Sequence, residues 1–240
     1  MWRDRGENME KLNVLYEDNQ IVVVLKPQNV PTQSDNSKDI DMLTMVKAYI
    51  KEKYNKPGEA YIGLVHRLDR PTGGIMVFAR NSKSAKRLSE EFASHEVEKV
   101  YYAVTTKIVR EKNKTLINYL EKNEKENIVK VVPMLTSGAK KAELNYKELE
   151  NDGEMSLLEV RILTGRSHQI RVQLSSYGYP LYGDAKYGKN KNMSSKNLGL
   201  WAGKLSFTHP TTKDKMVFMA CPDTSKEPWK RFKMDKYFVR

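Results

Sequence analysis

The sequence contains only one cysteine and four histidines, which leaves little material for disulfides or metal sites. One cysteine cannot form a disulfide within the chain, and these residues show no spacing typical of zinc ligands. No stretch approaches the roughly 18 consecutive apolar residues of a membrane-spanning helix. The N-terminal residues carry several charges where a secretion signal needs an apolar core. We therefore expect a cytoplasmic protein that binds neither metal nor membrane.

What the sequence does contain is an excess of positive charge. Lysine and arginine number 42 against 30 acidic residues, which gives a formal net charge of +12 over 240 residues. Such an excess attracts polyanions, nucleic acid first and anionic membrane second. A merely lysine-rich composition is the alternative, but basic and aromatic residues are interleaved near the motifs described below, which favours nucleic acid.

The hydrophobic patterns predict more strands than helices, joined largely by hairpins, which indicates an α+β fold with a bent, mainly antiparallel sheet and flanking helices. We expect a polar lead-in over 1–11, a catalytic domain over 12–222 and a basic helical tail over 223–240. The expected elements are a hairpin over 12–26, helices over 39–54 and 82–94, strands at 61–65, 75–79, 97–105 and 128–132, an irregular excursion over 107–126, a hairpin of 142–149 with 155–163, a helix after Ser167 that ends before Gly178, a loop over 179–188, a hairpin of 198–207 with 215–220, and a helix over 225–238.

One carboxylate stands in a segment that is otherwise basic, small or apolar, between two of the expected strands. The segment reads H-R-L-D-R-P-T-G-G over residues 66–74, and Asp69 is the only acidic residue between Glu59 and Glu90. Arg67 and Arg70 on either side would favour its ionised form. An ionised, positioned carboxylate can act as a nucleophile or a general base. The alternative is a salt bridge that only fixes the loop.

A second polar cluster, T-G-R-S-H-Q-I-R over residues 164–171, stands where a strand runs into a helix. Ser167 suits the N-cap. Helix N-termini attract phosphate and carboxylate groups, so the cations here are candidates for substrate binding. For His168 and Gln169, capping the helix start explains their presence equally well.

Four motifs in this order resemble the RluA family of RNA pseudouridine synthases, over about residues 12 to 222. In chain order they are K-P at 26–27, H-R-L-D-R-P-T-G-G at 66–74, K-V-Y-Y-A at 99–103, and G-R-S-H-Q-I-R at 165–171 with G-Y-P at 178–180 and G-D at 183–184. The chain departs from the family at Asn29 and Gln33, where glycine and histidine are common. Residues 107–126 match no family pattern, and we expect no S4 RNA-binding module before residue 12.

The resemblance implies isomerisation of uridine to pseudouridine in structured rRNA or tRNA, with no cofactor and no metal. Asp69 matches the essential aspartate, which attacks the substrate covalently or assists formation of a glycal; both routes stay open. Tyr101 matches the tyrosine that stacks on the base, with core packing as the alternative. Arg171, with Arg166 second, matches the arginine that pairs with the aspartate. We expect a monomer that needs no protein partner.

The target base must be flipped out of folded RNA, which requires cations to hold phosphates and a side chain to fill the gap. The residues expected to contact RNA are His66, Arg67, Arg70, Thr72, Lys83, Arg87, Arg166, His168, Gln169 and Lys186. Loop-bracing ion pairs are the alternative for Arg67 and Arg70, and a structural role is the alternative for His66.

Two other classes of function fit parts of the sequence. A non-enzymatic RNA-binding protein would explain the charge and the aromatic residues, but binding alone would not favour an anion between two arginines. A phosphotransferase is suggested superficially by H-R-L-D, but no Gly-rich phosphate loop precedes it and no D-F-G follows.

Overall fold

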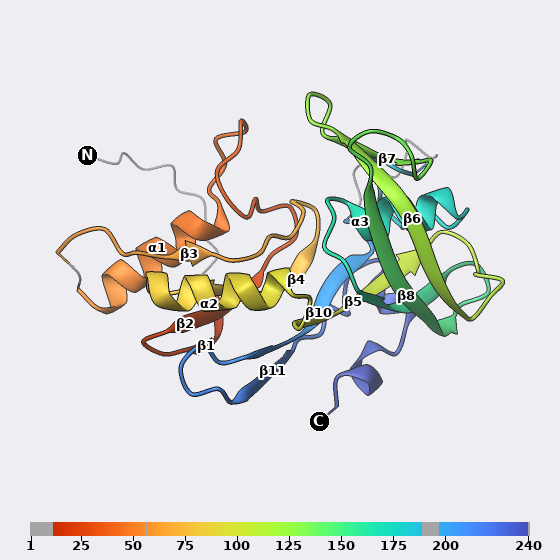
Figure 1. Cartoon of the computed structure of the whole chain (residues 1–240). Coiled ribbons are helices and arrows are strands. Elements are labelled where there is room, and N and C mark those ends of the chain that lie inside the picture. Colours follow the sequence, from red (N-terminus) through yellow and green to blue (C-terminus); the bar gives the residue numbers. More distant parts are fainter. Residues whose placement is uncertain (1–11, 56, 189–196, 240) are drawn as a thin grey trace.

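One sheet of eleven strands runs through the computed structural model, which describes residues 12–55, 57–188 and 197–239 (Figure 1). The strand order is β1-β2-β4-β10-β5-β9-β8-β6-β7, with β3 beside β4 and β11 beside β10. All pairs are antiparallel except β4 with β10, which run parallel over two residue pairs. The strands are β1 (Asn13–Glu17), β2 (Ile21–Lys26), β3 (Gly63–Leu64), β4 (Gly73–Ala79), β5 (Glu98–Thr105), β6 (Asn113–Asn123), β7 (Ile128–Val132), β8 (Lys140–Asn151), β9 (Ser156–Ile162), β10 (Leu200–Thr208) and β11 (Lys215–Met219). The expected α+β class with a mainly antiparallel sheet is confirmed.

Three helices, α1 (Met42–Lys53), α2 (Ser82–Ala93) and α3 (Gln169–Ser176), cover the sheet. Successive residues of β2 point to opposite faces. Val22 packs in the core that includes α1 and α3, whereas Val23 packs with Leu88 of α2 on the other face. Because both faces are covered, the strand is apolar throughout instead of alternating.

The C-terminal segment differs from the expected helix over 225–238. It forms two short 3₁₀ helices, η2 (Trp229–Arg231) and η3 (Met234–Tyr237), which pack against β5, β9 and β10. The buried anchors Trp229 and Phe232 are three residues apart, the repeat of a 3₁₀ helix. The expectation of a basic helix is wrong because these apolar anchors, not Lys230 and Arg231 between them, decide the local structure.

The expected irregular excursion over 107–126 is also wrong. Most of it forms β6, which pairs with β7 on one side and with β8 on the other. Leu116 and Leu120 are buried, while the residues around them are largely lysine, asparagine and glutamate. The other expected hairpins and helices are confirmed to within a few residues, although β3 is shorter than expected. The lead-in over 1–11 lies outside the described residues.

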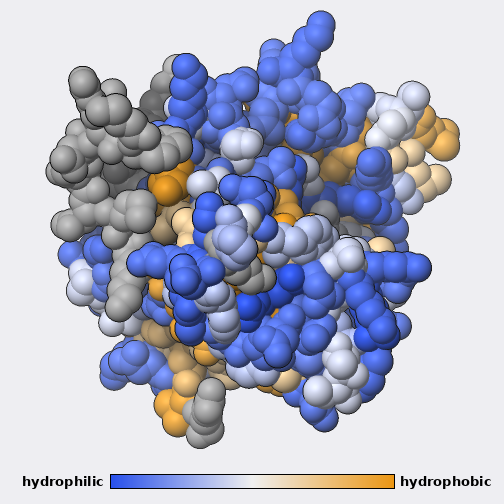
Figure 2. All heavy atoms as spheres, turned by 90° about the vertical axis from the view of Figure 1, so that its left-hand side faces the viewer, coloured by the Kyte–Doolittle hydropathy of each residue, from blue (hydrophilic) through white to orange (hydrophobic). Residues whose placement is uncertain are grey.

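Among the described residues, no helix combines the length and apolar character needed to cross a membrane. The face seen in Figure 2, on the side of α1, is mainly hydrophilic, with hydrophobic residues in small separate groups. The high charge content of the sequence is thus distributed over this surface.

Candidate active site

The register of three neighbouring strands brings the loop of Asp69 close to Tyr101. Gly74 of β4 lies opposite Ala202 of β10, and Ala202 lies opposite Tyr101 of β5. Gly74 has a φ of +128°, and a Cβ there would lie 2.3 Å from the carbonyl oxygen of Ala202, so the close approach requires glycine. The loop that carries Asp69 enters β4 at this point. Asp69 and Tyr101 therefore line one cavity of about 340 Å³.

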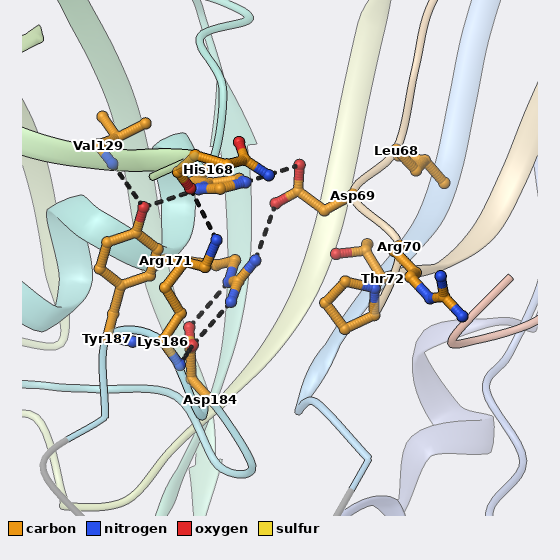
Figure 3. Close-up of polar contacts among 12 residues, drawn as sticks. Leu68, Asp69, Arg70, Thr72, Val129, His168, Arg171, Asp184, Lys186 and Tyr187 are labelled. Atoms are coloured by element: carbon orange, nitrogen blue, oxygen red, sulfur yellow. Dashed lines mark hydrogen bonds and ion pairs between the residues drawn. The ribbon is translucent and has the colours of Figure 1, made fainter. Parts of the chain in front are cut away.

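Asp69 pairs with an arginine that is distant in sequence (Figure 3). Nη1 of Arg171, on α3, lies 3.3 Å from Oδ2 of Asp69. Nε2 of His168 lies 3.9 Å from Oδ1. The other candidate, Arg166, instead donates from Nε to the carbonyl oxygen of Lys141 at 3.0 Å. In the structure Arg171, not Arg166, is therefore the partner of Asp69.

Arg171 is held from behind by a second carboxylate. Its Nε and Nη2 donate to the two oxygens of Asp184 at 2.9 and 2.8 Å, and both side chains are buried. Oδ1 of Asp184 also accepts the backbone N–H groups of Lys186 and Tyr187. Burial alone would raise the pKa of Asp184, but the hydrogen bonds and charge of Arg171 outweigh it and hold that pKa below its ordinary value. Asp184 thus aims the guanidinium at Asp69.

A buried lysine fixes the backbone that follows Asp69. Nζ of Lys26 donates to the carbonyl oxygens of Arg70 and Thr72 at 2.9 and 2.7 Å, and to that of Pro27 at 3.0 Å. Burial lowers the pKa of Lys26 to about 7, and the negative charge of Asp69 opposes this shift. Three carbonyl acceptors match the three N–H donors of an ammonium group.

Thr32 fixes the backbone on the other side of Asp69. Its hydroxyl donates to the carbonyl oxygen of Leu68 at 2.8 Å and accepts the N–H of the same residue at 3.3 Å. The peptide units before and after Asp69 are therefore both held, as a positioned reactive group requires.

The neighbouring arginines do not neutralise Asp69, contrary to the expectation from the sequence. Arg70 forms ion pairs with Asp35 and Asp39 and thereby braces a surface loop. Arg67 is exposed, lines the cavity and makes no ion pair with any described residue. Adjacent residues in an extended loop point in different directions, so closeness in sequence does not bring these charges together.

Tyr101 is buried beside Asp69. Burial raises the pKa of Tyr101 well above its ordinary value, and the charge of Asp69 adds to this shift, so the hydroxyl stays protonated at neutral pH. Among the described residues, none forms a hydrogen bond with that hydroxyl. The ring and hydroxyl are thus available to a bound base.

The residues expected to contact RNA line a first cavity, a second cavity, or neither, and two of them line both cavities. Those that line the first cavity are His66, Arg67, Thr72, Arg166, His168 and Gln169. Those that line a second cavity of about 450 Å³, which also adjoins Asp69, are Arg67, Arg70, His168 and Lys186. Neither cavity includes Lys83 or Arg87. Lys83 is exposed on α2, and Arg87 donates to the carbonyl oxygen of Pro210 at 2.6 Å.

One of the cavity residues, His66, is bound internally through its side chain, whereas the hydroxyl of Thr72 is not. Nε2 of His66 accepts the N–H of Val77 at 3.0 Å, and its ring stacks on Phe92 with the ring centroids 4.6 Å apart. Burial lowers the pKa of His66 to about 3, so the ring is neutral. The hydroxyl of Thr72 is buried and has no hydrogen-bond partner within the described part of the chain.

The start of α3 differs from the expectation. The N-cap is His168, in the left-handed conformation with a φ of 51°, and not Ser167. The side chain of Gln169 accepts the backbone N–H of Arg166 at 3.0 Å and so closes the turn before the helix. This geometry turns the His168 ring towards Asp69.

Three residues that shape the site received no role from the sequence: Lys26, Asp184 and Tyr187. Lys26 follows an apolar strand and precedes proline, a position where an unpaired lysine would be costly to bury. Asp184 is the one acidic residue in a loop of tyrosine and glycine. Both features were visible signals. Tyr187 had none that distinguished it from the other tyrosines nearby. In the described residues, no three histidine, cysteine, aspartate or glutamate side chains gather as metal ligands do.

Comparison with known protein families identifies the family of this chain. A family model described as RNA pseudouridylate synthase matches residues 20–176, more than half of the chain. The chain belongs to the RNA pseudouridylate synthase family. The assignment suggested by the four sequence motifs is thereby confirmed.

Three curated relatives are 28–29% identical to the chain over the aligned residues. An uncharacterized RNA pseudouridine synthase of Bacillus subtilis is 29% identical over 87% of the chain and 68% of its own length. A ribosomal large subunit pseudouridine synthase C of Vibrio vulnificus is 29% identical over 86% of the chain and 64% of its own length. A tRNA pseudouridine synthase C of Haemophilus ducreyi is 28% identical over 89% of the chain and 92% of its own length. The chain thus spans about two thirds of the first two proteins and most of the third.

Solved structures share the fold. Human RNA Pseudouridylate Synthase Domain Containing 4 superposes with a TM-score of 0.76 at 22% identity, over 91% of this chain and 90% of that one. Human RNA Pseudouridylate Synthase Domain Containing 1 gives 0.72 at 24% identity, over 92% and 87%.

Proposed function

We propose that this protein isomerises uridine to pseudouridine in a structured RNA, rRNA or tRNA, with Asp69 as the catalytic carboxylate. The observation that carries the proposal is that Asp69, among the described residues the only carboxylate lining its cavity, contacts the buried Arg171 and shares that cavity with the buried Tyr101. The named relatives act on large-subunit rRNA and on tRNA, which supports RNA as the substrate class.

The reaction needs no co-substrate, because the product contains the same atoms as the substrate. The bond from N1 to C1′ breaks, the uracil turns, a bond from C5 to C1′ forms, C5 loses a proton and N1 gains one. Asp69 begins this sequence by attacking C1′ or by removing the C2′ proton. Arg171 places its positive charge 3.3 Å from Oδ2 of Asp69 and so orients the carboxylate for either role. Tyr101 offers the ring on which a flipped uracil stacks.

Cations without carboxylate partners surround the entrance to Asp69. Arg67, Lys99 and Arg166 line the first cavity and make no ion pair with any of the residues that the structure describes. Phosphates are the natural ligands of such unpaired cations. The net charge of +12 strengthens their attraction for RNA.

One copy of the chain is enough for this chemistry, because Asp69, Tyr101 and Arg171 all come from the same chain. We therefore propose a monomer. We also propose that the protein is located in the cytoplasm, because its single cysteine cannot form a disulfide within the chain and the cytoplasm is reducing.

The test is to incubate the protein with transcribed rRNA and tRNA, without added nucleotide or metal, and to map pseudouridine. Asp69→Asn should lower the rate by about a thousandfold or more and leave RNA affinity within about tenfold. An Asp69→Asn variant with more than about a tenth of the wild-type rate would show that Asp69 is structural. Tight RNA binding without any pseudouridine would favour a non-enzymatic RNA-binding protein.

A further inference from the structure

A chain of polar contacts links the edge of the sheet to Asp69 (Figure 3). The N–H of Val129 donates to the hydroxyl of Tyr187 at 2.9 Å. That hydroxyl lies 2.7 Å from Nδ1 of His168, whose Nε2 faces Oδ1 of Asp69 at 3.9 Å. Val129 belongs to β7, the last strand of the sheet, so its outward N–H has no neighbouring strand and uses Tyr187 instead.

The number of protons in this chain of contacts determines which nitrogen of His168 carries hydrogen. The Tyr187 hydroxyl already accepts the N–H of Val129, and among the described residues His168 Nδ1 is the acceptor within reach of its own hydrogen, so we assign that hydrogen to Nδ1 of His168. Burial raises the pKa of Tyr187, which keeps the hydroxyl protonated. Burial lowers the pKa of His168, although Asp69 opposes the shift, which favours the neutral ring. A neutral imidazole has one N–H, and here it must be at Nε2.

We propose that His168 is a positioning residue that presents its Nε2–H to Asp69, with Tyr187 fixing the tautomer. This role rests on the proposed function, because it serves the same carboxylate. Arg171 faces Oδ2 and His168 faces Oδ1, so each oxygen of Asp69 meets a different donor. The 3.9 Å separation shortens to a hydrogen bond when a substrate fills the cavity, as catalytic hydrogen bonds commonly do.

A neutral donor suits this position better than a second cation. A second positive charge on Asp69 would stabilise the carboxylate further and so weaken it as a nucleophile or base. A neutral N–H fixes the rotation of the carboxylate with a smaller effect on its basicity. The arrangement therefore combines one cation, Arg171, with one neutral donor, His168.

The chain offers an internal reference for the tautomer. His66 is also neutral, but its Nε2 accepts the N–H of Val77, so its hydrogen must be at Nδ1. The structure thus assigns opposite tautomers to His66 and His168. Long-range ¹H–¹⁵N spectra of the histidine-labelled full-length chain distinguish the two forms, and four histidines can be assigned by single replacements.

The expected spectrum shows the Nε2–H form for His168 and the Nδ1–H form for His66. Tyr187→Phe should convert His168 to a mixture or to the Nδ1–H form and leave His66 unchanged. An Nδ1–H form of His168 in the wild type would overturn the proposal, as would a tautomer that does not respond to Tyr187→Phe. This readout needs no RNA, so it is independent of whether the proposed function is correct.

Turnover then tests the positioning role. His168→Met removes the donor and should lower kcat by about ten- to a hundredfold, with little change in KM or melting temperature. His168→Gln carries an amide N–H near the position of Nε2 and should recover much of that loss. Full kcat in His168→Met, or a rise in KM alone, would overturn the role and indicate at most an RNA contact. If the wild type forms no pseudouridine, the proposed function fails and the role of His168 fails with it, whereas the tautomer assignment stands or falls by the spectra.

Discussion

The same substitution at the two carboxylates that contact Arg171 should change the free energy of unfolding by very different amounts. Asp184 is fully buried and holds the guanidinium through two hydrogen bonds, whereas the Asp69 side chain is 26% exposed and makes one longer contact of 3.3 Å. Asp184→Asn removes the negative charge that compensates the buried guanidinium of Arg171. Asp69→Asn leaves Arg171 paired with Asp184, so it is the matched control.

The geometry sets the size of each effect. Removing one partner of a buried ion pair costs about 3–5 kcal/mol in the free energy of unfolding. For a chain of this size, 1 kcal/mol shifts the melting temperature by about 2–4 °C, so Asp184→Asn should melt roughly 6–20 °C below the wild type. Asp69→Asn should change the free energy of unfolding by less than about 1 kcal/mol, as expected for a partly exposed pair.

Urea unfolding between pH 3 and pH 7 tests the origin of the difference. The folded-state pKa of Asp184 is below its unfolded value of about 3.9, so its contribution is present above that value and is lost as the pH falls through the folded pKa. The deficit of Asp184→Asn should therefore be greatest near pH 7 and shrink below about pH 4. Equal destabilisation by the two substitutions, or a deficit that does not change with pH, would refute this account of Arg171.

Three further outcomes follow from the site. Arg171→Ala should lower kcat far more than Arg166→Ala in the pseudouridine assay, because Arg171 contacts Asp69 whereas Arg166 donates to the carbonyl oxygen of Lys141. Lys99→Met should reduce the slope of RNA affinity against salt by about one phosphate contact, whereas Lys83→Met, outside both cavities, should not. Lys26→Met should remove a stability contribution that is present above about pH 10.4, the unfolded pKa, and is lost as the pH falls through about 7, as measured by urea unfolding.

The strands of the sheet could be predicted from the sequence where each strand buries at least one face. The run Ile21–Lys26 and the hairpin signal at Asp152-Gly153 left little choice of structure. β6 was missed because only Leu116 and Leu120 of its eleven residues are buried, so charged side chains hide the pattern. Its pairing with β7 and β8 is a tertiary property that overrides local composition.

Only part of the site could be predicted from the sequence, because the contacts of Asp69 also depend on tertiary structure. Asp69 stood out as a lone acid, but its cation could not be found from its neighbours. Arg70, the next residue, turns to Asp35 and Asp39, while Arg171 approaches from 102 positions away. That approach depends on the whole strand order, which no local pattern contains. The family motif supplied Arg171 as a candidate, and the structure shows its contact with Asp69.

The buried charges of the molecule point to the site independently of any motif. Among the described residues, the buried side chains of lysine, arginine, aspartate and glutamate are Lys26, Asp41, Arg171 and Asp184. Asp41 caps α1, Lys26 holds the Asp69 loop, Arg171 contacts Asp69, and Asp184 holds Arg171. Apolar residues of similar size would often make a fold as stable or more stable at such positions, so stability alone does not explain three buried charges in one place. Their common feature is that each fixes the position of Asp69 or of the arginine that contacts it, a pattern that supports the proposed role of Asp69 as the catalytic carboxylate.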